Sequence, residues 1–260
     1  MNNKETLKLC KKERLGQEKL NYQGCIMKII EYNHSKDIVI EFQDEYKEKI
    51  HTSCSNFDRG NIKNHFYPTV LNIGYLGCDK VKNKSAYKCW TRMLNRCYDE
   101  KWFKKSPTYK NCNVCKEWHN YSNFEKWYEE NYYEISNERM CLDKDILIKG
   151  NKIYSPNTCC FVPSRINMLF EKCDKARSIY PIGVTRRERE NKYKNSYRAK
   201  CRLSNGKRIT SKSFETPLEC FYEYKRIKEK TIKEVADLYK DKIPNKLYNA
   251  MYKWIVEVND

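Results

Sequence analysis

Two cysteines near the middle of the chain have the spacing of metal ligands. Cys112 and Cys115 are separated by two residues, as in many structural Zn²⁺ sites built from thiolates. Four other cysteines are candidates to complete four ligands: Cys97, Cys141, Cys159 and Cys160. The alternative is a set of reduced thiols packed in the core, because no second C-x-x-C is present. The sequence leaves both interpretations open.

A strictly alternating strand suggests a second kind of chemistry, the binding of a polyanion. Residues 197–203 place apolar side chains on one face and three cations, Arg198, Lys200 and Arg202, on the other. Cations crowded on one face of a sheet repel each other unless phosphates or carboxylates lie beside them. A solvated charged face is the ordinary alternative.

The turn that follows decides how many cations share that face. We expect a three-residue loop, Ser204-Asn205-Gly206, with Gly206 in the left-handed conformation, which pairs Cys201 with Ile209. A two-residue loop would pair Leu203 with Arg208 and so place apolar and charged side chains on the same face. The preferred register adds Arg208 opposite Arg202 and Lys212 opposite Arg198.

Charge is concentrated around this ribbon. Residues 171–214 contain 14 Lys or Arg and 4 Asp or Glu, a net of +10 in a chain whose net charge is +18. Such a local excess predicts double-stranded DNA as the partner. A membrane partner is not expected, since no run of about 18 apolar residues exists.

The cysteines are also informative about location. The chain has 14 of them in 260 residues, and its first residues do not resemble an export signal. Disulfides persist mainly in oxidising compartments, so a disulfide framework is not expected. The predicted location is the cytoplasm.

The elements that must position these residues predict an α+β chain of several domains. We expect a small N-terminal β-barrel of the Tudor-like kind over residues 1–80, with a hairpin of 24–32 and 38–42 and further short strands around 66–70. Residues 81–175 would form a central domain and residues 176–260 a three-stranded sheet backed by a helix.

Apolar residues at helical spacing predict three helices. The first stripe is Ala86, Trp90, Met93, Leu94 and Cys97. The second helix would start at a capping box on Ser122 and bury Phe124, Trp127 and Tyr128. The third would start at Thr216, with the stripe Cys220, Tyr224, Ile227, Thr231, Val235 and Leu238. Between the last two, residues 141–167 predict a hairpin feeding a helix, a ββα layout.

The C-terminal part resembles the Apetala/ethylene-response-factor DNA-binding domain. The resemblance rests on Ile182-Gly183-Val184, Tyr197-Arg198-Ala199, Ser213-Phe214-Glu215-Thr216 and the helix that follows. That family places a three-stranded sheet in the major groove. The resemblance implies base or phosphate contacts from Arg186, Arg198, Lys200, Arg202, Arg208 and Lys212.

The middle part resembles the HNH endonucleases of phages, which belong to the ββα-metal (His-Me finger) group. The matching stretches are Trp90 to Tyr98, Val114-Cys115-Lys116-Glu117-Trp118, Leu142-Asp143-Lys144-Asp145, and Tyr154-Ser155-Pro156 leading to Cys159 and Asn167. Many phage members also carry an Apetala-type domain behind the nuclease, as homing endonucleases do. The resemblance implies that Asp143 and Asn167 hold one Mg²⁺ or another divalent ion.

The family's general base is missing at its usual place. The position after the metal Asp commonly carries His, and here it is Lys144, whose ammonium is better suited to stabilising phosphate charge. His119 is a candidate base and equally a candidate surface-loop residue. Two functions follow: a homing-type, metal-dependent DNA endonuclease of a phage-infected bacterial host, or a DNA-binding regulator or host-interaction protein that does not cut.

Overall fold

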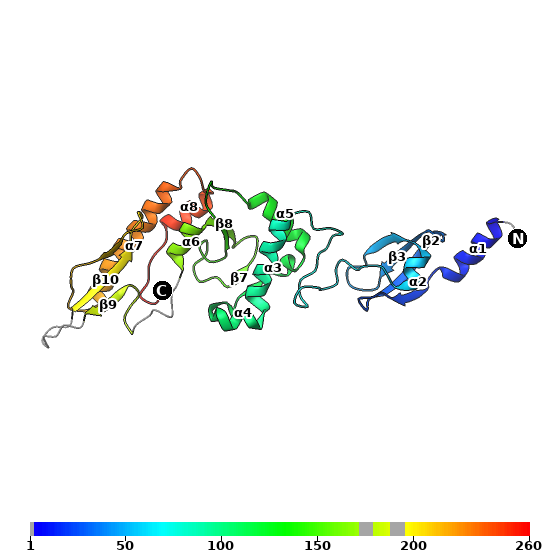
Figure 1. The fold of residues 1–260 in the computed structure, drawn as a ribbon, viewed down its shortest axis with the longest axis horizontal. Coiled ribbons are helices and arrows are strands. Elements are labelled where there is room, and N and C mark those ends of the chain that lie inside the picture. Colours follow the sequence, from blue (N-terminus) through cyan, green and yellow to red (C-terminus); the bar gives the residue numbers. More distant parts are fainter. Residues whose placement is uncertain (1–2, 172–178, 188–195) are drawn as a thin grey trace. The chain divides into compact units, whose positions relative to one another are not determined.

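The chain is a mixed α+β protein (Figure 1). The computed structural model describes residues 3–171, 179–187 and 196–260. Two compact units are present, Met1–Glu130 and Asn131–Asp260. The boundary between them falls inside the predicted central domain of residues 81–175, and the three-domain division stays a prediction.

The first unit begins with a helix and a four-stranded antiparallel sheet in the order β1-β2-β3-β4. The elements are α1 (Asn3–Arg14), β1 (Glu18–Leu20), β2 (Ile26–His34), β3 (Asp37–Phe42), β4 (Lys49–Thr52) and α2 (Cys54–Arg59). The predicted hairpin is confirmed as β2 and β3. Ile38, Ile40 and Phe42 are buried as expected, and Val39 is buried as well.

The expected barrel is wrong. Among the described residues the four strands form an open sheet whose edges are β1 and β4. The reason lies in what covers the core face: Cys54 and Phe57 of α2, together with Ile62, pack on the strands where further strands would be needed for closure. The predicted strand near residues 66–70 reduces to one isolated bridge between Val70 and Gly74.

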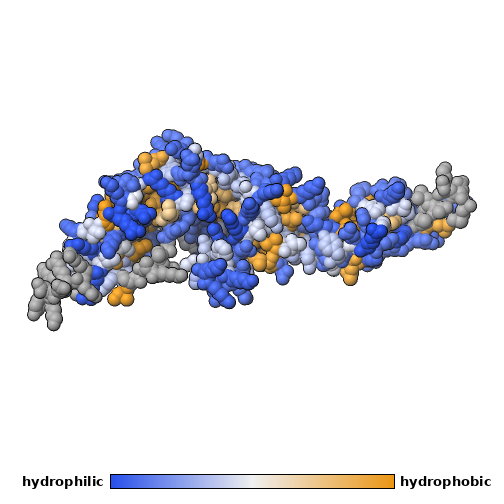
Figure 2. Space-filling model, in the orientation of Figure 1, coloured by the Kyte–Doolittle hydropathy of each residue, from blue (hydrophilic) through white to orange (hydrophobic). Residues whose placement is uncertain are grey.

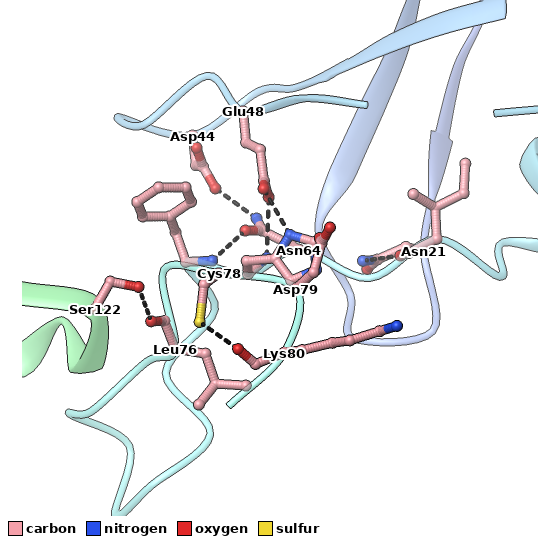
Figure 3. Close-up of polar contacts among 12 residues, drawn as sticks. Asn21, Asp44, Glu48, Asn64, Leu76, Cys78, Asp79, Lys80 and Ser122 are labelled. Carbon is pink, nitrogen blue, oxygen red and sulfur yellow. Dashed lines mark hydrogen bonds and ion pairs between the residues drawn. The ribbon is translucent and has the colours of Figure 1, made fainter. Parts of the chain in front are cut away.

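A polar junction around Asn64 fixes the segment that leaves this sheet (Figure 3). The buried Asn64 side chain donates to Asp44 Oδ2 at 2.6 Å and accepts from the Phe66 amide at 2.8 Å. Farther along the segment, Ser122 Oγ donates to the Leu76 carbonyl at 3.0 Å. The hydroxyl expected to cap a helix therefore holds this segment.

The rest of the first unit is mainly helical. Its elements are α3 (Lys84–Tyr98), α4 (Glu100–Lys105), η1 (Pro107–Tyr109), β5 (Asn113–Val114), η2 (Lys116–His119) and α5 (Tyr121–Asn131). All five residues of the predicted α3 stripe are buried, and so are the three predicted for α5. The start of α5 differs, because it begins at Tyr121 and the Ser122 amide donates to Asn120 Oδ1.

The second unit contains a compact ββα arrangement. It consists of β6 (Met140–Asp143), β8 (Cys160–Pro163) and α6 (Ser164–Phe170), and the short strand β7 (Ile153–Tyr154) lies between β6 and β8 in the sequence. β6 and β8 pair antiparallel, with Asp143 opposite Cys160, and α6 follows β8 without a gap. The predicted hairpin feeding a helix is thus present.

A three-stranded sheet in the order β11-β10-β9 follows. Its strands are β9 (Val184–Arg187), β10 (Ser196–Arg202) and β11 (Arg208–Thr210), and the helices are α7 (Pro217–Leu238) and α8 (Asn245–Tyr252). The predicted register is confirmed: Cys201 pairs with Ile209 and Arg202 with Arg208. Gly206 has a φ of 83°, as the three-residue loop requires.

The helix α7 carries the predicted capping box, in which Thr216 and Glu219 hydrogen-bond reciprocally. Its N-terminal half packs on the sheet through Cys220, Tyr224 and Ile227. Its C-terminal half packs through Ile232, Val235 and Ala236 into the core that contains Val162 and Ile166 of the ββα arrangement. One helix thus belongs to two cores (Figure 1). Leu238, predicted to be buried, is 57% exposed.

Candidate nucleic-acid interface and metal site

The outer face of the sheet presents a row of cations. On β10, Tyr197, Ala199 and Cys201 are buried against α7, whereas Lys200 and Arg202 are exposed. Arg208 of β11 is exposed and lies opposite Arg202, so it is on the same face. Arg198 is half-buried in the same alternation. These four residues, Arg198, Lys200, Arg202 and Arg208, are called the β10 row below.

No carboxylate of the described residues is paired with the β10 row. Within the described ranges, none of its four members forms an ion pair, and Arg198 uses its Nε to donate to Ser213 Oγ at 3.0 Å. The four positive charges of the row therefore lie close together on the outer face of the sheet. Such an arrangement gains free energy when polyanion phosphates come close.

Two of the predicted DNA-contacting residues lie elsewhere. Arg186 of β9 pairs with Tyr197, so its side chain leaves the sheet on the side of α7. Lys212 is not opposite Arg198, because the ladder shifts by one residue: Ala199 bonds to Ser211, and Tyr197 to Phe214. The Lys212 ammonium lies 5.6 Å from the centre of the Phe214 ring.

Asp143 ends strand β6 and is partly buried. Its Oδ1 accepts the amides of Asp145 and Ile146 at 2.9 and 2.8 Å. Burial, and then the neighbouring Asp145 carboxylate, raise the pKa of Asp143 to about 6, against the opposite effect of those amides and of Lys144. Its Oδ2 accepts no hydrogen bond from the described residues, so one carboxylate oxygen is left for a cation.

Lys144 has a structural role. Its side chain is only 8% exposed, and the ammonium donates to Asp145 Oδ2 at 3.2 Å. The same ammonium lies 5.9 Å from the centre of the Tyr154 ring. A cation in this position lowers the repulsion between Asp143 and Asp145, and it is not arranged as a proton acceptor.

Asn167 lies on α6, which packs against both β6 and β8. Its Nδ2 donates to Glu171 Oε1 at 2.9 Å, which leaves the amide Oδ1 without a hydrogen bond in the described part of the chain. The donor set of Asp143 and Asn167 therefore consists of two available oxygen atoms on adjoining elements. Hard oxygen ligands of this kind fit Mg²⁺.

His119 is not a surface-loop residue. It ends η2 with its ring edge-on to Tyr98 at 6.3 Å, and its Nε2 is buried without a hydrogen-bond partner among the residues described. Burial lowers the pKa of His119, although a hydrogen bond to the Val114 backbone opposes this. The net shift favours the neutral imidazole. It belongs to the first unit, and Asp143 to the second.

The cysteines proposed for Zn²⁺ are mostly buried. Burial raises the pKa of Cys115 and of Cys160, which favours the neutral thiol. Cys112 and Cys97 are buried in the first unit, and Cys159 in the second. Over residues 3–171, 179–187 and 196–260, no group of three or more His, Cys, Asp or Glu is arranged to hold a metal ion.

No family model, curated protein or solved structure matches this chain. The described residues also include no helix that combines the length and the apolar character needed to cross a bilayer.

Sequence reasoning missed two residues that organise the site. Asn151 Nδ2 donates to the carbonyls of Lys144 and Ile153, at 2.6 and 2.7 Å, and so closes the loop that follows Asp143. Arg165 of α6 donates to the carbonyl of Ser204, in the turn of the basic ribbon. The pair Gly150-Asn151 is typical of a turn, but nothing local in the sequence indicates that Arg165 reaches a residue 39 positions away.

Proposed function

We propose that the chain binds double-stranded DNA through the outer face of the β9–β11 sheet. The observation that carries this proposal is the β10 row, of whose four cations three are exposed and one is half-buried, and none has an ion-pair partner among the described residues. Phosphates would relieve the repulsion within the row and release condensed counterions on binding. Ala199 and Cys201 on the opposite face fix the strand against α7, so the row is rigid.

The salt dependence of binding tests this. The double variant Lys200→Ala and Arg202→Ala removes two phosphate contacts, so the slope of log K against log salt should become shallower by about 1.8. A matched variant, Lys240→Ala with Lys253→Ala, removes the same charge from exposed positions of the second unit away from the row. An equal change of slope in both variants would overturn the proposal.

We further propose that the bound DNA is cut, in a metal-dependent manner, by the ββα arrangement. The resemblance to phage HNH endonucleases, the pairing of β6 with β8 and the contact of α6 with both strands support this proposal. Asp143 and Asn167 would hold the divalent ion, which when bound would offset negative charge at the scissile phosphate. Asp143 is oriented for this by two backbone amides.

Water must also lose a proton in such a reaction. Lys144 is poorly suited, because its ammonium is buried and paired with Asp145. His119 is no better suited, because its Nε2 is buried and it belongs to the other unit. We therefore assign Lys144 as the residue that holds the two acidic side chains together, and we assign no side chain as the base.

Nicking of supercoiled plasmid in the presence of Mg²⁺ tests cleavage. Asp143→Asn should abolish nicking while DNA affinity at the β10 row is retained. Asp241→Asn, an exposed carboxylate of the same unit, is the control and should nick like the parent. Nicking that persists in Asp143→Asn would contradict the proposed centre.

A second function has a specific observation in its favour. Lys144 stands beside Asp143 where the family's nucleases commonly carry a histidine, and this lysine is tied to Asp145. A chain that binds DNA and does not cut, as a regulator or host-interaction protein, fits this feature. Tight, metal-independent DNA binding without nicking would favour it.

A further inference from the structure

A second row of cations lies on the first unit, along helix α3. The helix buries Ala86, Trp90, Met93, Leu94 and Cys97. Lys84, Lys88 and Arg92 follow one another at intervals of four residues, and all three are exposed. Residues four apart are neighbours on a helix surface, about 6 Å apart along its axis, so like charges at this spacing repel each other. Arg96 continues the series and is half-buried, with its guanidinium 5.5 Å from the centre of the Tyr109 ring.

Nothing on α3 compensates this charge. The sequence of the helix, KSAYKCWTRMLNRCY, contains no Asp or Glu. Lys84, Lys88 and Arg92 form no ion pair within the part of the chain that the structure describes. The α3 row, defined as these three residues, is therefore uncompensated in the same sense as the β10 row.

Helix α7 gives the comparison expected of an ordinary solvated face. Its cations alternate with glutamates, and three of them are paired: Lys225 with Glu229, Arg226 with Glu223, and Lys230 with Glu234. A solvent-facing helix in this chain is thus built with pairs three or four residues apart. Because α3 lacks them, solvation alone does not account for its row.

The positive surface continues beyond α3. Residues 80–116 contain 11 Lys or Arg and 2 Asp or Glu, a net charge of +9. Lys101, Lys104 and Lys105 of α4 are all exposed, and α4 contacts both α3 and η1. The surface over α4 is hydrophilic on the face in view (Figure 2). The excess is therefore comparable to that around the β10 row, and it lies on a different unit.

We propose that α3 and α4 form a second DNA-binding surface, which contacts the phosphate backbone of a duplex. Lysine is a flexible point charge that suits phosphates and carries little base specificity. Single-stranded nucleic acid would need exposed rings on which bases could stack. On α3, Tyr87 packs against Trp90 and Tyr121, and no aromatic side chain of α3 or α4 is exposed. The surface thus provides charge without stacking platforms, which favours a duplex.

The test uses the full chain and a labelled DNA duplex of mixed sequence. The triple variant Lys84→Ala, Lys88→Ala and Arg92→Ala should flatten the slope of log K against log salt by about 2.7, because three phosphate contacts are lost. Alanine has the highest helix propensity, so α3 should remain folded, and circular dichroism checks this.

A matched triple variant controls for net charge. Lys28→Ala, Lys49→Ala and Lys230→Ala remove three exposed cations that are paired with Glu18, Glu41 and Glu234. This variant should leave the slope within a few tenths of the parent's. Equal slopes for both triples, or no change in the α3 triple, would overturn the proposal. The same measurement with duplex RNA adds one more outcome. A triple variant that loses affinity for duplex RNA but keeps its affinity for duplex DNA would also overturn the proposal.

The same measurements keep this proposal separate from the β10 row. Combining the α3 triple with Lys200→Ala and Arg202→Ala should lower the slope by the sum of the two effects, since the residues belong to different units. If only the α3 triple acts, the sheet proposal fails and this one stands. If only the sheet variant acts, the reverse holds.

Discussion

Arg165 of helix α6 donates a hydrogen bond to the backbone carbonyl of Ser204, in the turn between β10 and β11. The Ser204 hydroxyl in turn donates to Glu234 Oε2 of α7 at 2.7 Å. The turn of the basic ribbon is therefore tied both to the helix that carries Asn167 and to the helix shared by the two cores. DNA lying on the ribbon would be held in a fixed relation to the proposed metal site.

Arg165→Met should loosen that connection without removing any residue of the β10 row. We expect faster hydrogen exchange at the amides of Leu203 and Gly206, and a loss of about 1 kcal/mol in the free energy of unfolding. Arg226→Met is the control, because it removes an arginine that pairs with Glu223 on α7. Unchanged exchange in the turn would contradict the proposed role.

The raised pKa of Asp143 predicts how stability depends on pH. The folded value of about 6 exceeds the ordinary 3.8, so the folded state binds the proton more tightly. The stabilisation is present below about pH 4 and is lost as the pH rises to about 6, on the order of 3 kcal/mol in all. Urea unfolding of the parent and of Asp143→Asn should diverge over this window. Parallel profiles would mean that Asp143 is not the titrating group.

The same carboxyl group should couple protons to Mg²⁺. Binding requires the ionised form, so the apparent affinity for Mg²⁺ should fall about tenfold per pH unit below pH 6. Calorimetric titration at several pH values measures this. Affinity that does not vary between pH 5 and pH 7 would exclude Asp143 as a ligand.

Asn151→Ala should disturb the loop after Asp143. The Lys144 and Ile153 carbonyls each lose a donor, which we expect to cost about 1–2 kcal/mol of stability and to weaken Mg²⁺ binding. Asn157→Ala changes an exposed asparagine of the next loop, between β7 and β8, and should have little effect. The shift in melting temperature on adding Mg²⁺ compares the two variants.

Lys144→His tests whether the site lacks only a base. An imidazole next to Asp143 should raise the rate of plasmid nicking about a hundredfold over Lys144→Gln. Both variants lose the ion pair with Asp145, so their stabilities should fall alike. Equal nicking rates in the two would show that an imidazole at this position does not act as the base.

Local patterns predicted the parts of the fold that local physics determines. The β10–β11 register follows from the alternation at Arg198 to Arg202 and from the glycine at 206, both of which lie within one short ribbon. The α7 cap was predictable because Thr216 and Glu219 are three residues apart. The ββα arrangement likewise followed from neighbouring segments.

Other parts depend on distant partners and could not be predicted in this way. Whether the N-terminal sheet closes depends on the packing of Phe57 and Ile62 on its core face. Leu238 continues the helical stripe of α7, but it lies at the last turn, where the helix leaves the core, and it is exposed. The Ser122 hydroxyl was expected to cap the start of α5, but it donates to the carbonyl of Leu76. The proposed site shows the same limit, since the contact of Arg165 with Ser204 bridges elements far apart in sequence.

The double membership of α7 bears on how the C-terminal half can be dissected. A fragment beginning at residue 176 would keep the ribbon and its helix but would lose Val162 and Ile166, which cover Ile232, Val235 and Ala236. Those apolar side chains would then face water, and the fragment should aggregate or pair with itself. Residues 131–260 should therefore melt in a single transition. A fragment trimmed to the sheet and α7 should become insoluble even though it keeps the cations of the β10 row.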